Sequence, residues 1–334
     1  MYTVRVVTNY DECRDIWRQM VPEEQLSDLW EVRDCFHRQY RHELYFVVAE
    51  ERGKLCGLLP LSWNREANAF HLFPGETWEG KTWLEQNRLI SRNRGMLRAM
   101  LKAVPQHVHL RYLQSTTTLE AFGQEVDEIG YYFLPPKYGF SMENYYEEFS
   151  HKSAKRLHRE LAEWDARNVT YRYDHAEDFE LMVAQNIERY GEGSYFSDPR
   201  FRRSFHSLVS FLTTMGWLRI TTVLVGGEVA AVDIGCMYKG TYTLLAGGTN
   251  ADFPGIAKLI NTHHMKWACD QRFERVDFLC GDFNWKRLFH LTENPLYLLS
   301  GDPDQLSRRR RVPATVIAPL PAEDTAVGGF VHVG

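Results

Sequence analysis

The stretch Phe253-Pro254-Gly255-Ile256-Ala257-Lys258 decides how the C-terminal half of this sequence is interpreted. The Pro-Gly pair predicts a turn, and apolar residues at helical spacing follow it, which predicts a helix from Ile256 onward. A helix start presents unpaired N–H groups and the positive end of the helix dipole, so this turn is a candidate site for an anionic group. The alternative is that Pro254-Gly255 is only a helix-entry turn.

Elements on both sides of this stretch follow a recognisable order. Before it, one strand and two helices lead into three strands at 217–225, 228–238 and 241–246, joined by short Gly-bearing connections typical of hairpins. After it come a strand at 275–280, a short helix near 285–289 and a strand at 296–299. The first strand is expected at 169–173, and the two helices carry apolar stripes that begin at Phe179 and Phe201.

The N-terminal half repeats this order more faintly. A strand at 2–7 precedes two helices near 11–20 and 28–40; a hairpin (44–50, 54–63), a strand at 69–73, a helix at roughly 84–103 and a strand at 107–113 follow. The sequence therefore predicts an α/β fold with mixed sheets in two tandem lobes, of which the C-terminal one is better formed. We expect lobes at 1–145 and 146–300 and a weakly structured tail at 301–334, which includes Arg308 to Arg311.

Composition narrows the class of protein. The 334 residues carry a formal net charge of -5, which argues against a general nucleic-acid binder. No apolar run approaches the roughly 20 residues that a membrane span needs. The six cysteines are scattered without a Cys-x-x-Cys pair, so they are expected to be small core residues in a reducing compartment. Together these features predict a cytoplasmic protein.

Several motifs resemble those of the GNAT N-acyltransferase superfamily. The C-terminal half is similar to the acetyltransferase domain grouped with Fem-type peptidyltransferases and with proteins of exopolysaccharide gene clusters. The similar features are a basic leading helix at 152–159, the hairpin at 225–230, the strand-loop-helix around Phe253-Pro254-Gly255, and the closing run Asp277 to Lys286. The resemblance covers about residues 150–300, and Fem-type proteins also have two tandem GNAT-like lobes.

The resemblance implies that acetyl-CoA or another acyl-CoA is the acyl donor. The expected donor-binding residues are Ala246, Gly247, Gly255, Ile256, Ala257 and Lys258. Superfamily members usually have Arg or Gln three residues before the glycine, whereas this chain has Asp252. That acidic residue departs from the pattern, and Lys258 is expected to compensate in part.

The first half has Phe73-Pro74-Gly75-Glu76 at the matching place. Because Glu76 and Glu79 would repel phosphate, we expect no donor site in this lobe, which would instead shape the acceptor side.

Acyl transfer to an amine requires a group that accepts the proton of the amine. Asp282 is expected to follow a strand end, where open sheets place their ligands, and it matches a Gly-Asp pair of the resembling domains. It is our first candidate for the base or an acceptor contact, and the alternative is a helix N-cap. Asp233 lies in mid-strand, where a carboxylate is either functional or a satisfied buried group.

The acceptor-binding candidates are less specific. Lys286 matches a family Tyr-Lys or Phe-Lys element and would contact a phosphate or carboxylate, or else be solvated. Lys155 and Arg159 belong to the basic helix, whose face either binds phosphates or is solvated. The resemblance places Arg189 and Tyr190 on the acceptor side. His263 and His264 are expected to be core or helix-face residues rather than bases, and no cluster has metal-ligand spacing, so no metal is expected.

We expect an acyl-CoA-dependent N-acyltransferase whose acceptor is a small molecule or a cell-envelope precursor, such as an amino sugar of an envelope polysaccharide or a peptide precursor. No nucleic-acid partner is expected, except under one alternative: a Fem-like transferase that takes its aminoacyl group from charged tRNA. A second alternative is a non-catalytic binding module with the GNAT fold.

Overall fold

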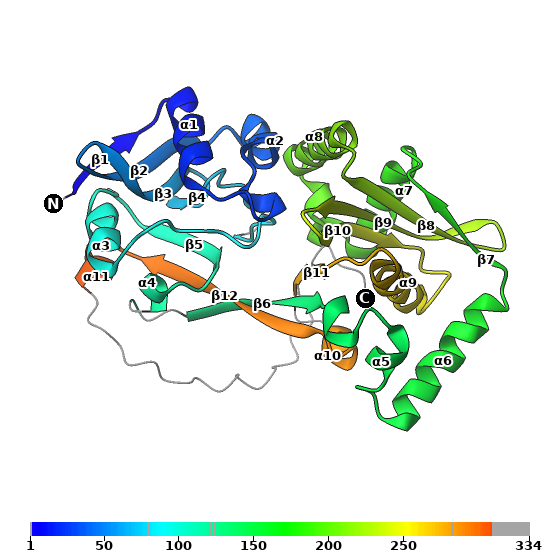
Figure 1. Cartoon of the computed structure of the whole chain (residues 1–334). Coiled ribbons are helices and arrows are strands. Elements are labelled where there is room, and N and C mark those ends of the chain that lie inside the picture. The colour runs from blue at the N-terminus through cyan, green and yellow to red at the C-terminus, as the bar shows by residue number, and fades with distance from the viewer. Residues whose placement is uncertain (1, 79, 121, 123–124, 282–283, 309–334) are drawn as a thin grey trace. The chain divides into compact units, whose positions relative to one another are not determined.

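The computed structural model describes residues 2–78, 80–120, 122, 125–281 and 284–308 (Figure 1). The chain forms two compact units. Of the described residues, the N-terminal unit holds those up to Glu128, Arg203–Leu208 and those from Pro295 to Arg308, and the C-terminal unit holds Ile129–Arg202 and those from Val209 to Asn294. Each contains neighbouring strands of a mixed sheet together with helices, so the expected α/β class is confirmed.

The sheet of the N-terminal unit has the strand order β1-β2-β3-β4-β5-β12. Its strands are β1 (Thr3–Val7), β2 (Glu43–Glu51), β3 (Lys54–Asn64), β4 (Ala69–Leu72), β5 (Val108–Leu113) and β12 (Thr292–Gly301). Neighbours are antiparallel except β4 and β5, which are parallel. The helical segments are α1 (Tyr10–Met20), η1 (Leu26–Asp28), α2 (Trp30–Tyr40), α3 (Arg94–Lys102), α4 (Thr117–Glu120) and α11 (Pro303–Arg308).

Alternating side chains of β2 divide the core of this unit between the two faces of the sheet. Val47 packs with Met96 and Met100 of α3, whereas Phe46 packs with Trp17 of α1 and Trp30 of α2. The sheet is therefore covered on both faces.

The helix expected at 84–103 is too long, because α3 begins only at Arg94. The Asn93 side chain accepts the backbone N–H of Met96 at 3.0 Å and so caps the helix start. The preceding segment is held as loop by strand-like bonds, from Asn87 N–H to the Tyr112 carbonyl (2.8 Å) and from Leu58 N–H to the Ile90 carbonyl (2.7 Å).

The sheet of the C-terminal unit has the order β6-β11-β10-β9-β8-β7. Its strands are β6 (Glu125–Phe133), β7 (Val169–Tyr173), β8 (Leu218–Val225), β9 (Glu228–Tyr238), β10 (Thr241–Thr249) and β11 (Arg275–Cys280). Only β10 and β11 are parallel; the other neighbours are antiparallel. The helical segments are η2 (Pro135–Tyr138), α5 (Met142–Tyr146), α6 (His151–Asp165), α7 (Asp178–Tyr190), η3 (Gly191–Gly193), η4 (Tyr195–Ser197), α8 (Pro199–Met215), α9 (Ile256–Asp270) and α10 (Asn284–Leu288).

Helices α7 and α9 cover opposite faces of this sheet, as strand alternation requires (Figure 1). Gly248 faces α7, since a Cβ there would lie 2.6 Å from the Met182 carbonyl oxygen. Asp233 of β9 pairs with Gly247, which directly precedes Gly248. The Asp233 side chain therefore points to the opposite face of the sheet, where its carboxylate contacts His264 of α9. The absence of a side chain at Gly248 lets α7 lie close to β10.

Two strands, β6 and β12, pair with strands from the other half of the sequence. β6 follows the N-terminal elements in the chain, yet Val276 and Asp277 of β11 pair with its Phe133 and Tyr132. Conversely, β12 closes the C-terminal half in sequence but pairs with β5, Tyr297 opposite Leu113. The sequence predicted β12 as a strand but gave no indication of β6 or of this exchange.

The expected weakly structured tail lies largely outside the described residues, which end at Arg308. Residues 303–308 form α11, whose Leu306 packs into the core with Met96 and Met100 of α3. Three of the four residues of the Arg308 to Arg311 run are not described. Within the described ranges, none of the helices has the length and apolar character that crossing a bilayer requires.

Candidate functional site

The parallel pair at the centre of the C-terminal unit separates along its length. β10 and β11 pair only at Thr241–Arg275, Tyr242–Val276 and Thr243–Asp277, although both strands continue further. A register shift between Leu244 and Ala246 in the pairing with β9 marks the same point of β10. Ala246 and Gly247 therefore lie on β10 beyond its last pair with β11, and the Gly247 carbonyl accepts the side-chain amide of Asn186 at 2.8 Å.

A pocket of about 390 Å³ lies at the start of α9. The loop after β10 and the first turns of α9 supply most of its wall, from Thr249 to Asn261. Arg189 of α7 and the rings of Trp285 and Phe289 complete the lining. The expected donor residues Gly255, Ile256, Ala257 and Lys258 are thus brought together in one pocket.

The Pro-Gly turn has the conformation that only glycine adopts easily. Gly255 has φ +88°, and a Cβ built on it would meet nothing within 4 Å, so the turn needs glycine for its backbone and leaves open space beside it. The N–H groups of Ile256 and Lys258 already donate to the carbonyls of Phe253 and Gly255, each at 3.1 Å. Two donors of the helix start are therefore engaged within the chain.

The two charged residues of this stretch have distinct environments. Lys258 forms an ion pair with Glu160, which joins α9 to α6. Asp252 is exposed, and its backbone N–H donates to the side chain of Asn250 at 2.9 Å. The Glu160 carboxylate thus compensates the positive charge of Lys258. Lys258 therefore attracts an anion less strongly than the sequence predicts.

Asp233 and His264 form a fully buried pair behind this pocket. Their side chains are 0% exposed, with 2.9 Å between Asp233 Oδ2 and His264 Nε2. Burial raises the pKa of the Asp233 carboxyl, and the bond to His264 opposes this rise. Neither residue lines the pocket, so Asp233 joins α9 to β9 rather than facing a ligand.

Lys286 is also fully buried. Its ammonium donates to the carbonyls of Phe278 (2.9 Å), Leu279 (3.0 Å) and Cys280 (2.8 Å). It thereby fixes the end of β11, where Leu279 has the unusual φ of +55°. Asp282 lies outside the described residues, four positions before this lysine.

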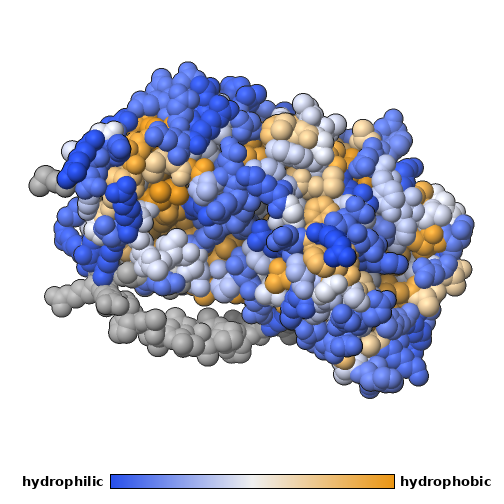
Figure 2. Space-filling view, in the orientation of Figure 1, coloured by the Kyte–Doolittle hydropathy of each residue, from blue (hydrophilic) through white to orange (hydrophobic). Residues whose placement is uncertain are grey.

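The other acceptor-side candidates do not gather at one point. Arg189 stands at the pocket, where its guanidinium donates to the Thr249 hydroxyl at 3.1 Å, and the ring of Tyr190 lies beneath it, 5.7 Å away. Lys155 and Arg159 are exposed on α6, whose visible face is largely hydrophilic (Figure 2). A second pocket of about 330 Å³ lies between later residues of α6 and the Pro254-Gly255 turn.

Sequence reasoning missed Asn261, Trp285 and Phe289 as pocket residues. One signal was available for Asn261, a polar residue next to Ile260 in the apolar stripe of α9. The aromatic residues come from α10 (Trp285) and the position directly after it (Phe289), and no local pattern indicates that they lie across from α9.

The matching place in the N-terminal unit is built differently, although Gly75 repeats the left-handed turn with φ +78°. After this turn the chain forms a long loop instead of a helix. The buried carboxylate of Glu76 accepts the Thr82 hydroxyl and the Leu84 N–H (2.9 Å for the latter). Burial raises the pKa of Glu76 to about 7, and the Arg33 charge opposes that rise.

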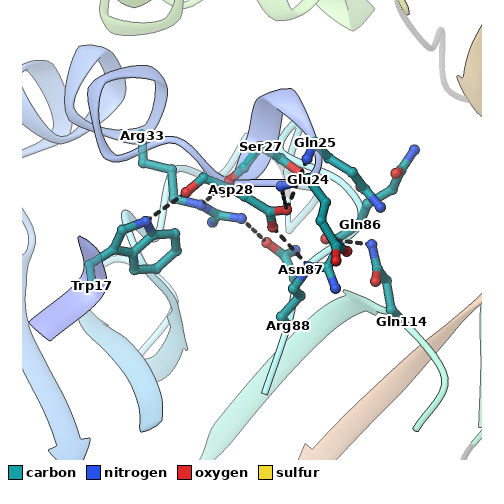
Figure 3. Close-up of polar contacts among 10 residues, drawn as sticks. All are labelled: Trp17, Glu24, Gln25, Ser27, Asp28, Arg33, Gln86, Asn87, Arg88 and Gln114. Atoms are coloured by element: carbon teal, nitrogen blue, oxygen red, sulfur yellow. Dashed lines mark hydrogen bonds and ion pairs between the residues drawn. The ribbon is translucent and has the colours of Figure 1, made fainter. Parts of the chain in front are cut away.

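Arg33 also contacts this loop, through the side chain of Asn87 (Figure 3). Its guanidinium donates to the Phe73 carbonyl, to Asn87 Oδ1 (2.7 Å) and to the Ser27 carbonyl (2.7 Å). The Phe73 carbonyl and the Asn87 side chain beside the turn are thus bonded within the chain. Among the described residues of the whole chain, no group of three or more His, Cys, Asp or Glu is arranged to hold a metal ion.

Residues 150–287 match the family model of the acetyltransferase (GNAT) domain. No curated protein matches the chain. Solved structures resemble it over most of their length at low identity. The structure titled FemX has a TM-score of 0.56 at 10% identity and covers 90% of this chain and 98% of its own.

The C-terminal domain of a putative lysylphosphatidylglycerol synthetase from Agrobacterium fabrum has a TM-score of 0.54 at 10% identity, covering 90% of this chain and 95% of its own. A tandem GNAT protein from the clavulanic acid biosynthesis pathway has a TM-score of 0.50 at 10% identity, with 91% and 99% covered. The chain therefore has a GNAT-like fold related to Fem-type proteins, as expected, with tandem lobes.

Proposed function

We propose that this protein is an N-acyltransferase that moves an acyl group from acyl-CoA to an amine. The observation that carries the proposal is the separation of β10 from β11 beside the pocket at Gly255. A separation of two parallel strands exposes backbone N–H groups, and such groups stabilise the oxyanion of acyl transfer. We assign Ala246 and Gly247 to this part of the donor site. We assign residues 255–258 to the wall of the same site.

The reaction needs no covalent intermediate on the protein. The amine nitrogen attacks the thioester carbonyl carbon, and the new C–N bond forms as the amine proton goes to a base. The C–S bond then breaks, and CoA leaves as the thiolate with the bonding electron pair. We assign the base to Asp282, the carboxylate that follows β11 and Gly281 in the chain. Asp233 acts through His264 by holding α9, and Lys286 acts by holding the end of β11.

We place the acceptor beside Arg189 and Tyr190. The Arg189 guanidinium is exposed at the pocket and suits an acceptor that carries a phosphate or carboxylate. This charge favours a small or cell-envelope-related acceptor, an amino sugar or a peptide precursor, over an uncharged amine. The protein would act in the cytoplasm, where acyl-CoA is available.

A second candidate is a transferase that takes an aminoacyl group from charged tRNA. The observation that favours it is the exposed basic part of α6, with Lys152, Lys155 and Arg156 in its first turns and no acidic residue before Glu160. Phosphate groups of a nucleic acid would contact such a face. A non-catalytic binding module would use the same pocket without transfer.

Calorimetric titration of the full chain with acetyl-CoA and longer acyl-CoAs tests the proposal. We expect saturable binding by the wild type and none by Gly255→Glu, since a long acidic side chain would enter the pocket. Gly216→Glu is the matched control, because Gly216 also has a left-handed φ (+69°) with open space but caps α8 away from the pocket. The control shows whether a glutamate in a left-handed backbone conformation changes acyl-CoA binding when it lies away from the pocket.

Three outcomes would contradict the proposal. Absence of binding by the wild type at millimolar acyl-CoA would refute a coenzyme-dependent enzyme. Unchanged affinity of Gly255→Glu would place the donor elsewhere. Preference for aminoacyl-tRNA over acyl-CoA would establish the second candidate instead.

A further inference from the structure

Three aromatic rings lie together at one end of the strands β2, β3 and β4 in the N-terminal unit. Glu43 begins β2, Trp63 of β3 pairs with it, and Phe70 of β4 pairs with Trp63. Directly paired residues of neighbouring strands point to the same face of a sheet. Tyr45 shares this face, because it lies two positions after Glu43 on β2. Tyr45, Trp63 and Phe70 therefore form an aromatic cluster beside the Glu43 carboxylate.

Helix α3 covers this face of the sheet only in part. The helix packs its apolar side on the sheet and ends at Lys102. Directly after it, the Ala103 carbonyl accepts the Tyr45 hydroxyl at 2.7 Å, and the chain returns to the sheet at Val108, where β5 begins. The aromatic cluster thus lies at the end of the surface that the helix covers, and a hollow of about 630 Å³ opens over it.

The rings of the cluster are tilted around Phe70. The centroid of the Phe70 ring lies 4.8 Å from that of Tyr45 and 4.8 Å from that of Trp63, and the interplanar angles are 47° and 54°. Phe70 is 4% exposed, whereas Tyr45 and Trp63 are half-buried. Phe70 therefore forms the base of the hollow, and the two other rings form its sides.

The hollow attracts positive charge. Of the described residues that line it, only Glu43 carries a formal charge; the remaining lining residues are the aromatic cluster, Thr8, Leu44 and Gln106. The faces of aromatic rings are also negative. The Glu43 carboxylate pairs with Arg65, but their side chains are 61% and 76% exposed. Because water screens such an exposed pair, it contributes little, and another cation can replace Arg65.

We propose that this hollow is a binding site for a compact organic cation, an alkylammonium head group that lies against the aromatic cluster with Glu43 as its counter-ion. A quaternary ammonium fits best, because the ring faces attract its charge and it has no N–H groups that would need acceptors. The site goes beyond acyl transfer, since none of its residues belongs to the proposed donor or acceptor site.

The test uses choline and its neutral isostere 3,3-dimethylbutan-1-ol, in which a carbon atom replaces the ammonium nitrogen. Both carry the same group of three methyls, whose NMR signal gives the two dissociation constants on the full-length protein. The indole N–H signal of Trp63, identified by its absence in Trp63→Leu, locates the site. We expect choline to saturate this site and to bind roughly tenfold or more tightly than the alcohol, because only choline has a charge for the rings and the carboxylate.

Three variants separate the contributions. Trp63→Leu should weaken choline by roughly 2- to 30-fold, the range for one cation–π contact. Glu43→Gln keeps the shape of the side chain and should weaken choline by roughly 2- to 5-fold. Arg65→Gln should strengthen choline binding, because it removes the cation that competes for Glu43. Trp217→Leu is the matched control: Trp217 is a half-buried tryptophan of the C-terminal unit, 4.8 Å from the ring of Tyr238, and its loss should leave the affinity unchanged.

Equal affinity of choline and the alcohol would overturn the proposal, because the hollow would then select only for apolar surface. The proposal also fails if choline leaves the Trp63 signal unchanged, or if Glu43→Gln binds choline like the wild type. A larger shift of the Trp63 signal with N-acetylglucosamine than with choline would identify a saccharide site instead. Glu43 and Arg65 are exposed, so their variants test the role of charge even if Trp63→Leu does not fold.

Discussion

Glu76 is an acidic side chain that the fold buries completely. Its exposed fraction is 2%, and its carboxylate accepts one hydroxyl and one backbone N–H, while the guanidinium of Arg33 approaches without bonding it. The sequence predicted that Glu76 would repel phosphate, and the structure adds that it organises the loop after Gly75. In the N-terminal lobe, the Glu76 carboxylate thus lies after the Phe-Pro-Gly turn. At the matching position of the C-terminal lobe there is an open pocket.

This burial predicts a pH dependence of stability. The pKa of Glu76 is raised from 4.5 to about 7, so the folded state binds the proton more tightly than the unfolded state. The resulting stability is present below pH 4.5 and is lost as pH rises to about 7, by at most about 3 kcal/mol. Glu76→Gln keeps the accepting oxygen and removes this titration.

Urea unfolding of both proteins between pH 4.5 and 8 measures the effect. The wild type should lose stability relative to Glu76→Gln as pH rises, and the difference should become constant above pH 7. Other groups that contribute in this range, such as His71, whose pKa burial lowers to about 3 in the folded state, are common to both proteins and cancel. If the free energies of unfolding of the two proteins changed with pH in parallel, the pKa of Glu76 would be the same in the folded and unfolded states, and the prediction would be wrong.

The base is a second prediction at the level of one residue. Asp282→Asn should lower the acyl-transfer rate by roughly 10²–10⁴-fold, because the amine proton loses its acceptor, and should change donor affinity little. Steady-state rates and calorimetric constants measure the two effects. Asp270→Asn, at the exposed C-terminal end of α9, is the control. An unchanged turnover of Asp282→Asn would exclude Asp282 as the base.

Among single residues, the sequence predicted those whose role is set by the backbone. Gly255 and Gly75 were identified from the Pro-Gly pair, and both have positive φ. The environments of Asp233, Lys286 and Asn261 were not predictable, because each depends on which distant element covers the side chain. The sequence Trp285-Lys286, for example, does not indicate that three backbone carbonyls will accept hydrogen bonds from the lysine ammonium.

At the level of elements, the end of β11 depends on one buried ammonium. Lys286 lies on the short helix α10 and donates to three successive carbonyls of β11. The short helix and the strand end are therefore fixed to each other. Because Trp285 lies next to Lys286 on α10 and Phe289 directly follows this helix, this contact also sets part of the pocket wall.

Lys286→Met should destabilise the protein by roughly 3–5 kcal/mol, since it leaves several buried carbonyls without a donor. Lys266→Met is the control, because Lys266 is an exposed lysine of α9; its effect should stay within about 0.5 kcal/mol. Chemical unfolding of both variants measures the difference. A loss below 1 kcal/mol in Lys286→Met would contradict the structural role.

The elements of the C-terminal half were predicted well because glycine turns separate them. The Gly226-Gly227 and Lys239-Gly240 turns mark the ends of β8, β9 and β10, and apolar spacing marks α7 to α9. In the N-terminal half, the helix expected from residue 84 begins only at Arg94, since the segment before it pairs with strands. β6 was missed because its pairing partner, β11, lies about 140 positions further along the chain.

At the scale of the whole molecule, the two halves repeat one plan with different outcomes. Each has a hairpin, a third strand and a Phe-Pro-Gly turn with the glycine in the left-handed region. The exchange of β6 and β12 completes each sheet with a strand from the other half of the sequence. One turn leads directly into a helix beside a pocket, and the other leads into a loop fixed by Glu76 and Arg33.

Hydrogen–deuterium exchange of the full chain with and without saturating acetyl-CoA tests the central claim most directly, that only the C-terminal turn binds the donor. We predict slower exchange in peptides that cover residues 246–261. Peptides that cover residues 73–91 of the N-terminal lobe should exchange at the same rate in both conditions. Protection confined to residues 73–91, or no protection of residues 246–261, would contradict the account.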